Sequence, residues 1–195
     1  MSNKKTIIGS GLAGPLLAIL LAKRGYAVDL FEKHADPRLE HVPAGRSINL
    51  ALSHRGIEAL KSASVFEMVE PLLIPMKGRM IHQKNGELDF QPYSMNAEEY
   101  INSVSRSELN KILITAAEDT GKVNIHFSHA LSSIQDNQLE FENSHKVEIE
   151  NEIIGADGSG SVVRKYIDSN CDLPSTTKPL GHAYKELTIA PGKNG

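Results

Sequence analysis

The chain has 195 residues with 40% apolar and 23% charged side chains, a formal net charge of −3 and one cysteine. This composition is ordinary for a globular protein, and the charge gives no electrostatic reason to expect nucleic acid or an anionic membrane as a partner. A single cysteine excludes an intramolecular disulfide and fits a reducing compartment, so we expect a cytoplasmic location. The longest apolar stretch, Leu16 to Ala22, is too short to span a bilayer, so we expect no membrane contact from this portion.

The first predicted element is a strand at Thr6 to Ile8, which enters the glycine-rich turn Gly9-Ser10-Gly11-Leu12-Ala13-Gly14. An apolar helix follows, with Pro15 in its first turn and Gly25 after its end. A second strand then ends at Glu32. Strand, glycine turn, helix, strand and terminal acid in this order are typical of a dinucleotide-binding βαβ unit.

Each glycine of this turn has a separate expected role. Gly9 permits the tight turn, Gly11 lets the backbone approach a pyrophosphate, and Gly14 lets helix and strand pack closely. The positive end of the helix then faces the phosphates, and Glu32 can accept hydrogen bonds from ribose hydroxyls. Glycine turns also occur for packing alone, but the order and spacing of strand, turn, helix and terminal acid favour a nucleotide site. Which dinucleotide binds stays open.

The next part of the chain interrupts the α/β alternation. A polar, proline-containing segment over 34–45 precedes a short helix predicted from Ser53 to Lys61, with Ser53 as its N-cap. Two segments, 79–82 and 88–91, flank Asn85-Gly86. The Asn-Gly pair predicts a β-hairpin with a two-residue turn.

Alternation resumes at the capping box Ser105-Arg106-Ser107-Glu108, because apolar residues follow it at helical spacing: Leu109, Ile112, Leu113, Ala116 and Ala117. Short strands separated by turns predict a β-meander over 123–149. A second glycine-rich turn, Gly155 to Ser161, joins a strand to a helix, and a last strand is predicted over 183–189.

Other chemistry finds little support in the sequence. His126 and His129 are expected on opposite faces of a strand, and no cysteine or carboxylate cluster accompanies them, so no metal site is predicted. Cys171 has no partner histidine nearby, which disfavours nucleophilic catalysis.

Three features together resemble the flavoprotein aromatic hydroxylases, and the resemblance runs through essentially the whole chain: Gly9-x-Gly11-x-x-Gly14 with Glu32, the arginine of Ser105-Arg106-Ser107, and Gly155-Ala156-Asp157-Gly158 followed by Ser161 and Arg164. Three further stretches, 45–52, 76–82 and 184–187, resemble the members of this family that act on L-kynurenine in tryptophan degradation.

The resemblance implies FAD as cofactor, with NADPH and O2 as co-substrates, in the hydroxylation of L-kynurenine to 3-hydroxykynurenine. No catalytic side chain is implied, because the chemistry is the cofactor's. Arg79 and Tyr93 are the implied substrate-binding residues, since a guanidinium pairs well with an amino-acid carboxylate. Asp157 is expected to act indirectly. The implied cofactor-binding residues are Gly9, Gly11, Leu12, Ala13, Gly14, Glu32, Lys33, Arg46, Leu52, Arg106, Leu131 and Asp157.

The expected fold is α/β, a Rossmann-like FAD-binding domain with a β-meander and part of a mixed-sheet substrate domain. Residues 1–75 and 101–175 are assigned to the first, and 76–100 and 176–195 to the second. Members of the family are more than twice this length, so the chain is expected to be a truncated form without the C-terminal half, with an incomplete FAD site that puts its activity alone in doubt.

Two other functions stay open at this point. One is an NAD(P)-dependent Rossmann dehydrogenase, against which the meander and the second glycine turn count. The other is a non-catalytic flavin- or nucleotide-binding module. The sequence does not predict an oligomeric state.

Overall fold

The computed structural model describes residues 3–39, 49–96, 98–171 and 175–182. Its central sheet has four parallel strands in the order β12 (Ile153–Gly155), β1 (Lys4–Ile8), β2 (Ala27–Phe31) and β8 (Val123–His126). Helix α1 (Ala13–Lys23) connects β1 to β2. The predicted βαβ unit is therefore confirmed.

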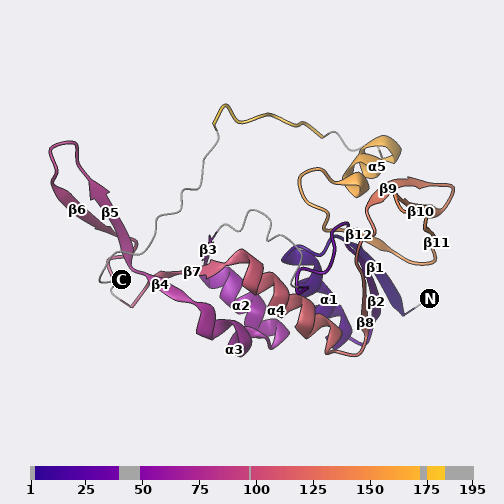
Figure 1. Cartoon of the computed structure of the whole chain (residues 1–195), viewed down its shortest axis with the longest axis horizontal. Helices are drawn as coiled ribbons and strands as arrows, with labels where there is room; N and C mark the ends of the chain where they lie inside the picture. The colour runs from indigo at the N-terminus through magenta and orange to yellow at the C-terminus, as the bar shows by residue number, and fades with distance from the viewer. Residues whose placement is uncertain (1–2, 40–48, 97, 172–174, 183–195) are drawn as a thin grey trace.

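Alternating side chains of the central sheet build two cores, one on each face. Ile7, Val28 and Leu30 are fully buried among the helices α1 and α4 (Arg106–Glu118). Ile8 and Phe31 point the other way and pack against an antiparallel meander. Its strands are β9 (Leu131–Gln135), β10 (Gln138–Phe141) and β11 (Lys146–Glu148), and helix α5 (Val162–Asn170) packs against β9. The predicted meander is confirmed for these three strands, whereas the strand expected to begin it, over 123–127, forms β8 of the parallel sheet. Figure 1 shows α1 and α4 on one side of the sheet, and the meander with α5 on the other.

A second, antiparallel sheet extends the helical side. Its order is β3 (Asn49–Leu52), β7 (Ile101–Ser105) and β4 (Ile74–Met76), and β7 runs directly into α4. Between β3 and β4 the chain forms α2 (His54–Ala63), α3 (Phe66–Val69) and the 3-10 helix η1 (Glu70–Leu72). This sheet links the body of the molecule to a hairpin of two strands.

The hairpin consists of β5 (Gly78–His82) and β6 (Leu88–Pro92) and projects from the end of the molecule opposite the parallel sheet (Figure 1). Met80 lies opposite Phe90 on one face, and both side chains are about half exposed, at 48% and 52%. Arg79 lies opposite Gln91 on the other face. The hairpin thus has one apolar and one polar face.

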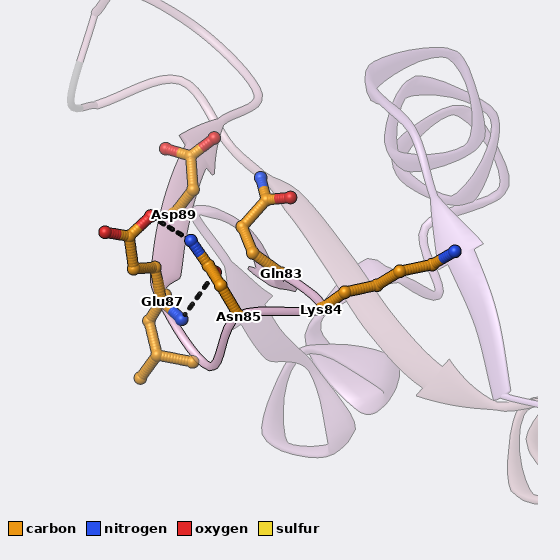
Figure 2. Close-up of a pocket in the computed structure, with 6 residues that line it drawn as sticks. Gln83, Lys84, Asn85, Glu87 and Asp89 are labelled. Atoms are coloured by element: carbon orange, nitrogen blue, oxygen red, sulfur yellow. Dashed lines mark hydrogen bonds between the residues drawn. The ribbon is translucent and has the colours of Figure 1, made fainter.

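The predicted two-residue turn of this hairpin is wrong. Gln83 and Glu87 close the loop instead, since the Gln83 N–H donates to the Glu87 carbonyl at 2.9 Å. A two-residue turn of the Asn-Gly kind needs a positive φ at both central residues, and only Gly86 has one, at +88°. The Asn85 side chain accepts from the Glu87 N–H at 3.1 Å and donates to the Glu87 carboxylate at 2.8 Å, which stabilises the longer loop (Figure 2).

The predicted helix ends are mostly confirmed. Gly25 has a φ of +93° and donates its N–H to the Ala22 carbonyl, which ends α1. Ser105 Oγ accepts from the Glu108 N–H at 3.4 Å, but the Glu108 carboxylate pairs with Lys111, so half of the capping box forms. Ser53 occupies the N-cap position of α2 without a side-chain hydrogen bond. The strand expected over 183–189 lies outside the described residues.

The expectation that His126 and His129 lie on opposite faces of a strand is also wrong. Strand β8 ends at His126, and the chain turns at Ser128, whose φ is +59°. The two rings therefore meet edge to face with centroids 5.9 Å apart, and both contact Phe31. Within the described ranges, no three histidine, cysteine or acidic side chains are grouped to hold a metal ion.

None of the helices in the described residues combines the length and the apolar composition that crossing a membrane requires.

Candidate functional site

Three chain segments meet at the carboxyl edge of the parallel sheet. The glycine loop 9–14 follows β1, Glu32 follows β2, and the second glycine turn 155–161 follows β12, and these strands are neighbours. The first and third segments are joined by a hydrogen bond from the Ala156 N–H to the Ile8 carbonyl at 2.7 Å. This edge is where open parallel sheets bind nucleotides.

Gly9 and Gly14 are required by close packing of the backbone. Gly9 has a φ of +104°, and a Cβ on it would lie 2.4 Å from the carbonyl oxygen of Ala156. A Cβ on Gly14 would lie 2.0 Å from the carbonyl oxygen of Gly9. These distances are far below van der Waals contact, so neither position accommodates a side chain without a shift of the backbone.

Gly11 differs, because a Cβ built on it meets no atom within 4 Å. Packing does not explain a glycine here, whereas the approach of a ligand does. The N-cap residue of α1 is Leu12, which supplies no side-chain cap, so the first N–H groups of α1 are not paired by a side chain at that position. The space and the donors fit a pyrophosphate.

Glu32 is tied to the glycine loop. Its Oε2 accepts from the Ser10 N–H at 2.6 Å and its Oε1 accepts from the His34 N–H at 2.9 Å, while the residue is only 9% exposed. Each carboxylate oxygen can accept more than one hydrogen bond. The residue therefore holds the loop and keeps acceptor capacity for ribose hydroxyls.

Ser10 contributes a polar atom that has no partner. Its hydroxyl oxygen is buried and makes no hydrogen bond with the described residues. A buried polar group left unpaired costs about 1–3 kcal/mol. Such an orphaned group within the loop is consistent with a site that a polar ligand completes.

Asp157 is engaged at the start of α5. Its Oδ2 accepts from the Val162 N–H at 2.7 Å and the Val163 N–H at 3.3 Å, and its Oδ1 accepts from the Ser161 hydroxyl at 2.6 Å. Ser161 in turn caps α5 by accepting from the Arg164 N–H at 2.9 Å. The carboxylate therefore fixes the second glycine turn against the helix.

The remaining expected cofactor residues lie on several separate elements. Arg106 is the exposed first residue of α4. Leu52 ends β3, and Leu131 begins β9 on the opposite face of the parallel sheet. Arg46 lies outside the described residues. The other two residues are both exposed: Lys33 follows Glu32, and Ala13 is the first residue of α1.

Arg79 and Tyr93 are not brought to this edge. They lie on the projecting hairpin, away from the glycine loop (Figure 1). The Arg79 guanidinium donates from Nε and Nη2 to Gln91 Oε1, at 3.0 and 2.8 Å. Tyr93 continues the ladder through its N–H to the Lys77 carbonyl and, by alternation from Gln91, shares the Arg79 face.

Sequence reasoning overlooked one residue of the loop's surroundings. Asn110 on α4 donates from Nδ2 to the carbonyls of Ser10 and Gly11. A weak signal was available, because Asn110 lies four residues after Arg106 and so on the same face of the helix.

Comparisons with known proteins agree with this geometry. The sequence matches the FAD binding domain family over residues 4–184. It is 43% identical over 196 residues to kynurenine 3-monooxygenase of Myxococcus xanthus (strain DK1622), covering 97% of this chain and 42% of that protein. It is also 43% identical over 190 residues to kynurenine 3-monooxygenase of Legionella pneumophila (strain Corby), covering 95% of this chain and 42% of that protein. The chain thus spans about 42% of the length of these curated relatives.

Solved structures show the same fold. The tetrameric form of 2-methyl-3-hydroxypyridine-5-carboxylic acid oxygenase superposes with a TM-score of 0.68 at 23% identity, over 85% of this chain and 42% of that one. The predicted α/β fold is thereby confirmed, and the family match includes both glycine turns, Glu32 and the meander. The chain therefore belongs to the FAD binding domain family.

Proposed function

We propose that this chain is the FAD-binding part of an aromatic hydroxylase that uses NADPH and O2 to convert L-kynurenine to 3-hydroxykynurenine. The observation that carries the cofactor is the glycine loop, in which Gly9 and Gly14 are packed tightly while Gly11 faces open space. The observation that supports the substrate is 43% identity with two kynurenine 3-monooxygenases over nearly the whole chain.

The chain's own residues would bind and orient the cofactor. The Gly11 and Leu12 N–H groups and the positive end of α1 would hold the pyrophosphate, and Glu32 would hold the ribose. Asp157 would act indirectly, by fixing the second glycine turn. When bound, FAD supplies the electron transfer from NADPH and the activation of O2. The charged or apolar side chains proposed to line the rest of the cofactor are Lys33, Arg46, Leu52, Arg106 and Leu131.

The polar face of the hairpin is the proposed contact with the substrate. Gln91 takes hydrogen bonds from Nε and Nη2 of Arg79, and a guanidinium has five N–H donors, so Nη1 retains donors for a carboxylate. The Tyr93 hydroxyl on the same face can donate to the same carboxylate. We assign residues 76–100 and 176–195 to the substrate-binding part, and 1–75 and 101–175 to the FAD-binding part.

The dehydrogenase hypothesis is disfavoured. In this chain a β-meander covers one face of the parallel sheet. In a doubly wound nicotinamide domain, by contrast, helices cover both faces of the sheet. Membership of the FAD binding domain family also favours flavin. A cytoplasmic location rests on the single cysteine and stays a prediction.

The test has two stages. First, the complete gene product is titrated with FAD and the quenching of flavin fluorescence is followed; saturable binding is expected, and its absence would contradict the cofactor assignment. Second, the complete gene product is incubated with L-kynurenine, NADPH and O2, and the product is identified by mass. A hydroxylated kynurenine supports the proposal, whereas a flavin-loaded protein that consumes no kynurenine points to another aromatic acid or to a non-catalytic module.

A further inference from the structure

Asn110 connects helix α4 to the glycine loop, which is distant in sequence. Its Nδ2 donates to the Ser10 carbonyl at 2.9 Å and to the Gly11 carbonyl at 3.2 Å, across 100 and 99 residues. A side-chain amide nitrogen carries two hydrogens, so each carbonyl can receive one. The residue is partly buried where α4 packs beside α1.

The two contacted carbonyls fix the orientation of two peptide groups. A trans peptide bond is planar, and its C=O and N–H point in opposite directions. The Ser10 carbonyl shares its peptide group with the Gly11 N–H, and the Gly11 carbonyl shares its own with the Leu12 N–H. When Asn110 draws both oxygens toward α4, both N–H groups are turned away from α4.

These two N–H groups lie beside the open space over Gly11. Neither donates a hydrogen bond to another part of the described chain. If either peptide group were reversed, a carbonyl oxygen would replace an N–H at the place where an anion is expected, and it would repel a phosphate. The orientation of these groups therefore decides whether the loop attracts or repels an anion.

We propose that Asn110 is a positioning residue of the phosphate site, which keeps the Gly11 and Leu12 N–H groups directed at the cofactor's pyrophosphate. The inference rests on the proposed FAD function and deepens it, since Asn110 itself does not touch the cofactor. A loss of two hydrogen bonds at this loop corresponds to at least about a tenfold loss of affinity.

The experiment compares FAD affinity with stability in the complete gene product. Asn110→Asp keeps the shape of the side chain, but its carboxylate cannot donate and repels both carbonyls. Asn110→Ala removes the donor without adding a charge. The matched control is Asn143→Asp, because Asn143 is an exposed asparagine whose Nδ2 also donates to a backbone carbonyl, that of Ser128 at 3.2 Å, outside the glycine loop.

The dissociation constant for FAD is measured by fluorescence quenching at a temperature where circular dichroism shows each variant folded. We expect it to rise at least about tenfold in both Asn110 variants and to stay near the original value in Asn143→Asp. Amide hydrogen exchange in the FAD-free chain is expected to be faster over residues 9–14 in Asn110→Ala. Asn110→Gln, which keeps the amide donor, is expected to bind FAD more tightly than Asn110→Ala. A role in packing alone would not require the amide donor for this recovery.

The outcomes separate this inference from the proposed function. If the original chain binds FAD and the Asn110 variants bind it equally well, the positioning role is refuted while the FAD function stands. If the complete gene product without substitutions does not bind FAD, both are refuted. If Asn110→Asp does not fold, the comparison of Asn110→Ala with Asn110→Gln decides in the same way.

Discussion

Glu32 accepts a hydrogen bond from the backbone N–H of Ser10 at 2.6 Å, which ties the end of β2 to the glycine loop at the end of β1. The same carboxylate accepts from the His34 N–H at 2.9 Å. Glu32 therefore organises the site even before a ribose is bound, and its two roles can be measured separately.

We expect Glu32→Ala to lower the free energy of unfolding by about 2 kcal/mol without FAD, because it leaves the buried Ser10 N–H and the partly buried His34 N–H without their acceptor. Glu32→Gln keeps one acceptor oxygen and should lose about 1 kcal/mol. Urea unfolding of the FAD-free chain measures both changes. Glu142→Ala, at an exposed position, serves as control, and equal stability of all three variants would contradict the structural role.

The glycines of the loop should respond differently to the same change. Gly11→Ala and Gly11→Val are expected to leave the melting temperature nearly unchanged, since a side chain there meets open space, but to abolish or strongly weaken FAD binding. Gly14→Ala is expected to destabilise the fold itself, by about 2 kcal/mol or more, because its Cβ meets the Gly9 carbonyl oxygen.

Thermal unfolding and FAD titration on the same samples separate these effects. An undiminished flavin affinity in Gly11→Val would refute the assignment of the pyrophosphate to that space.

Arg79→Ala is expected to raise the KM for L-kynurenine at least about tenfold in the complete gene product while FAD stays bound, because the guanidinium is the proposed partner of the substrate carboxylate. Steady-state kinetics and the flavin spectrum provide the two measurements. Lys84→Ala, which removes a cation at the tip of the same hairpin, is the matched control (Figure 2). Loss of the flavin together with the substrate would contradict this division of roles.

The acid stability of the chain should depend on Arg38. Hydrogen bonds from the Arg38 guanidinium hold the pKa of Asp36 below its ordinary value of 3.8, although burial acts in the opposite direction. A carboxylate with a lowered pKa stabilises the fold above its unfolded pKa, and this contribution is lost as the pH falls through the folded pKa. We therefore expect Arg38→Gln to be less stable than the original by about 1 kcal/mol at pH 7, and the difference to shrink below about pH 4.

Urea unfolding at a series of pH values tests this. Lys61→Gln, which removes the exposed pair with Glu58, is the control and should show a smaller effect at every pH. A difference between Arg38→Gln and the original that stays constant down to pH 2 would refute the linkage.

Much of the fold could be predicted because the signals are local. The glycine loop and α1 follow from one motif, α4 follows from apolar residues at helical spacing, and the meander follows from short strands separated by turns. The meander turn at Asp136-Asn137 has positive φ at both residues, at +47° and +59°. The hairpin turn could not be predicted in the same way, because the Asn85 side chain bonds to Glu87 and leaves its own φ outside the positive region. No pattern in the sequence indicated α3, η1 or β4.

The parts of the candidate site that lie within one short motif could be predicted from the sequence. The parts that depend on contacts between distant elements could not. The roles of Gly9, Gly11 and Gly14 are inherent in one short motif. The contact of Asn110 with that motif forms only because α4 packs beside α1, and the position of Asn110 four residues after Arg106 gives only a weak sign of such a partner. The meeting of His126 and His129 depends likewise on where β8 ends.

The pairing of β1 with β12 has a consequence for the order of folding. The glycine loop leaves β1 near the start of the chain, yet Gly9 takes its final place against Ala156, beyond almost all the other elements. A nascent chain that has emerged only as far as the meander contains the glycine motif, but it lacks β12 and Ala156, against which Gly9 packs. Contacts of such long separation form late. Acquisition of flavin fluorescence quenching during refolding would therefore report completion of the whole parallel sheet.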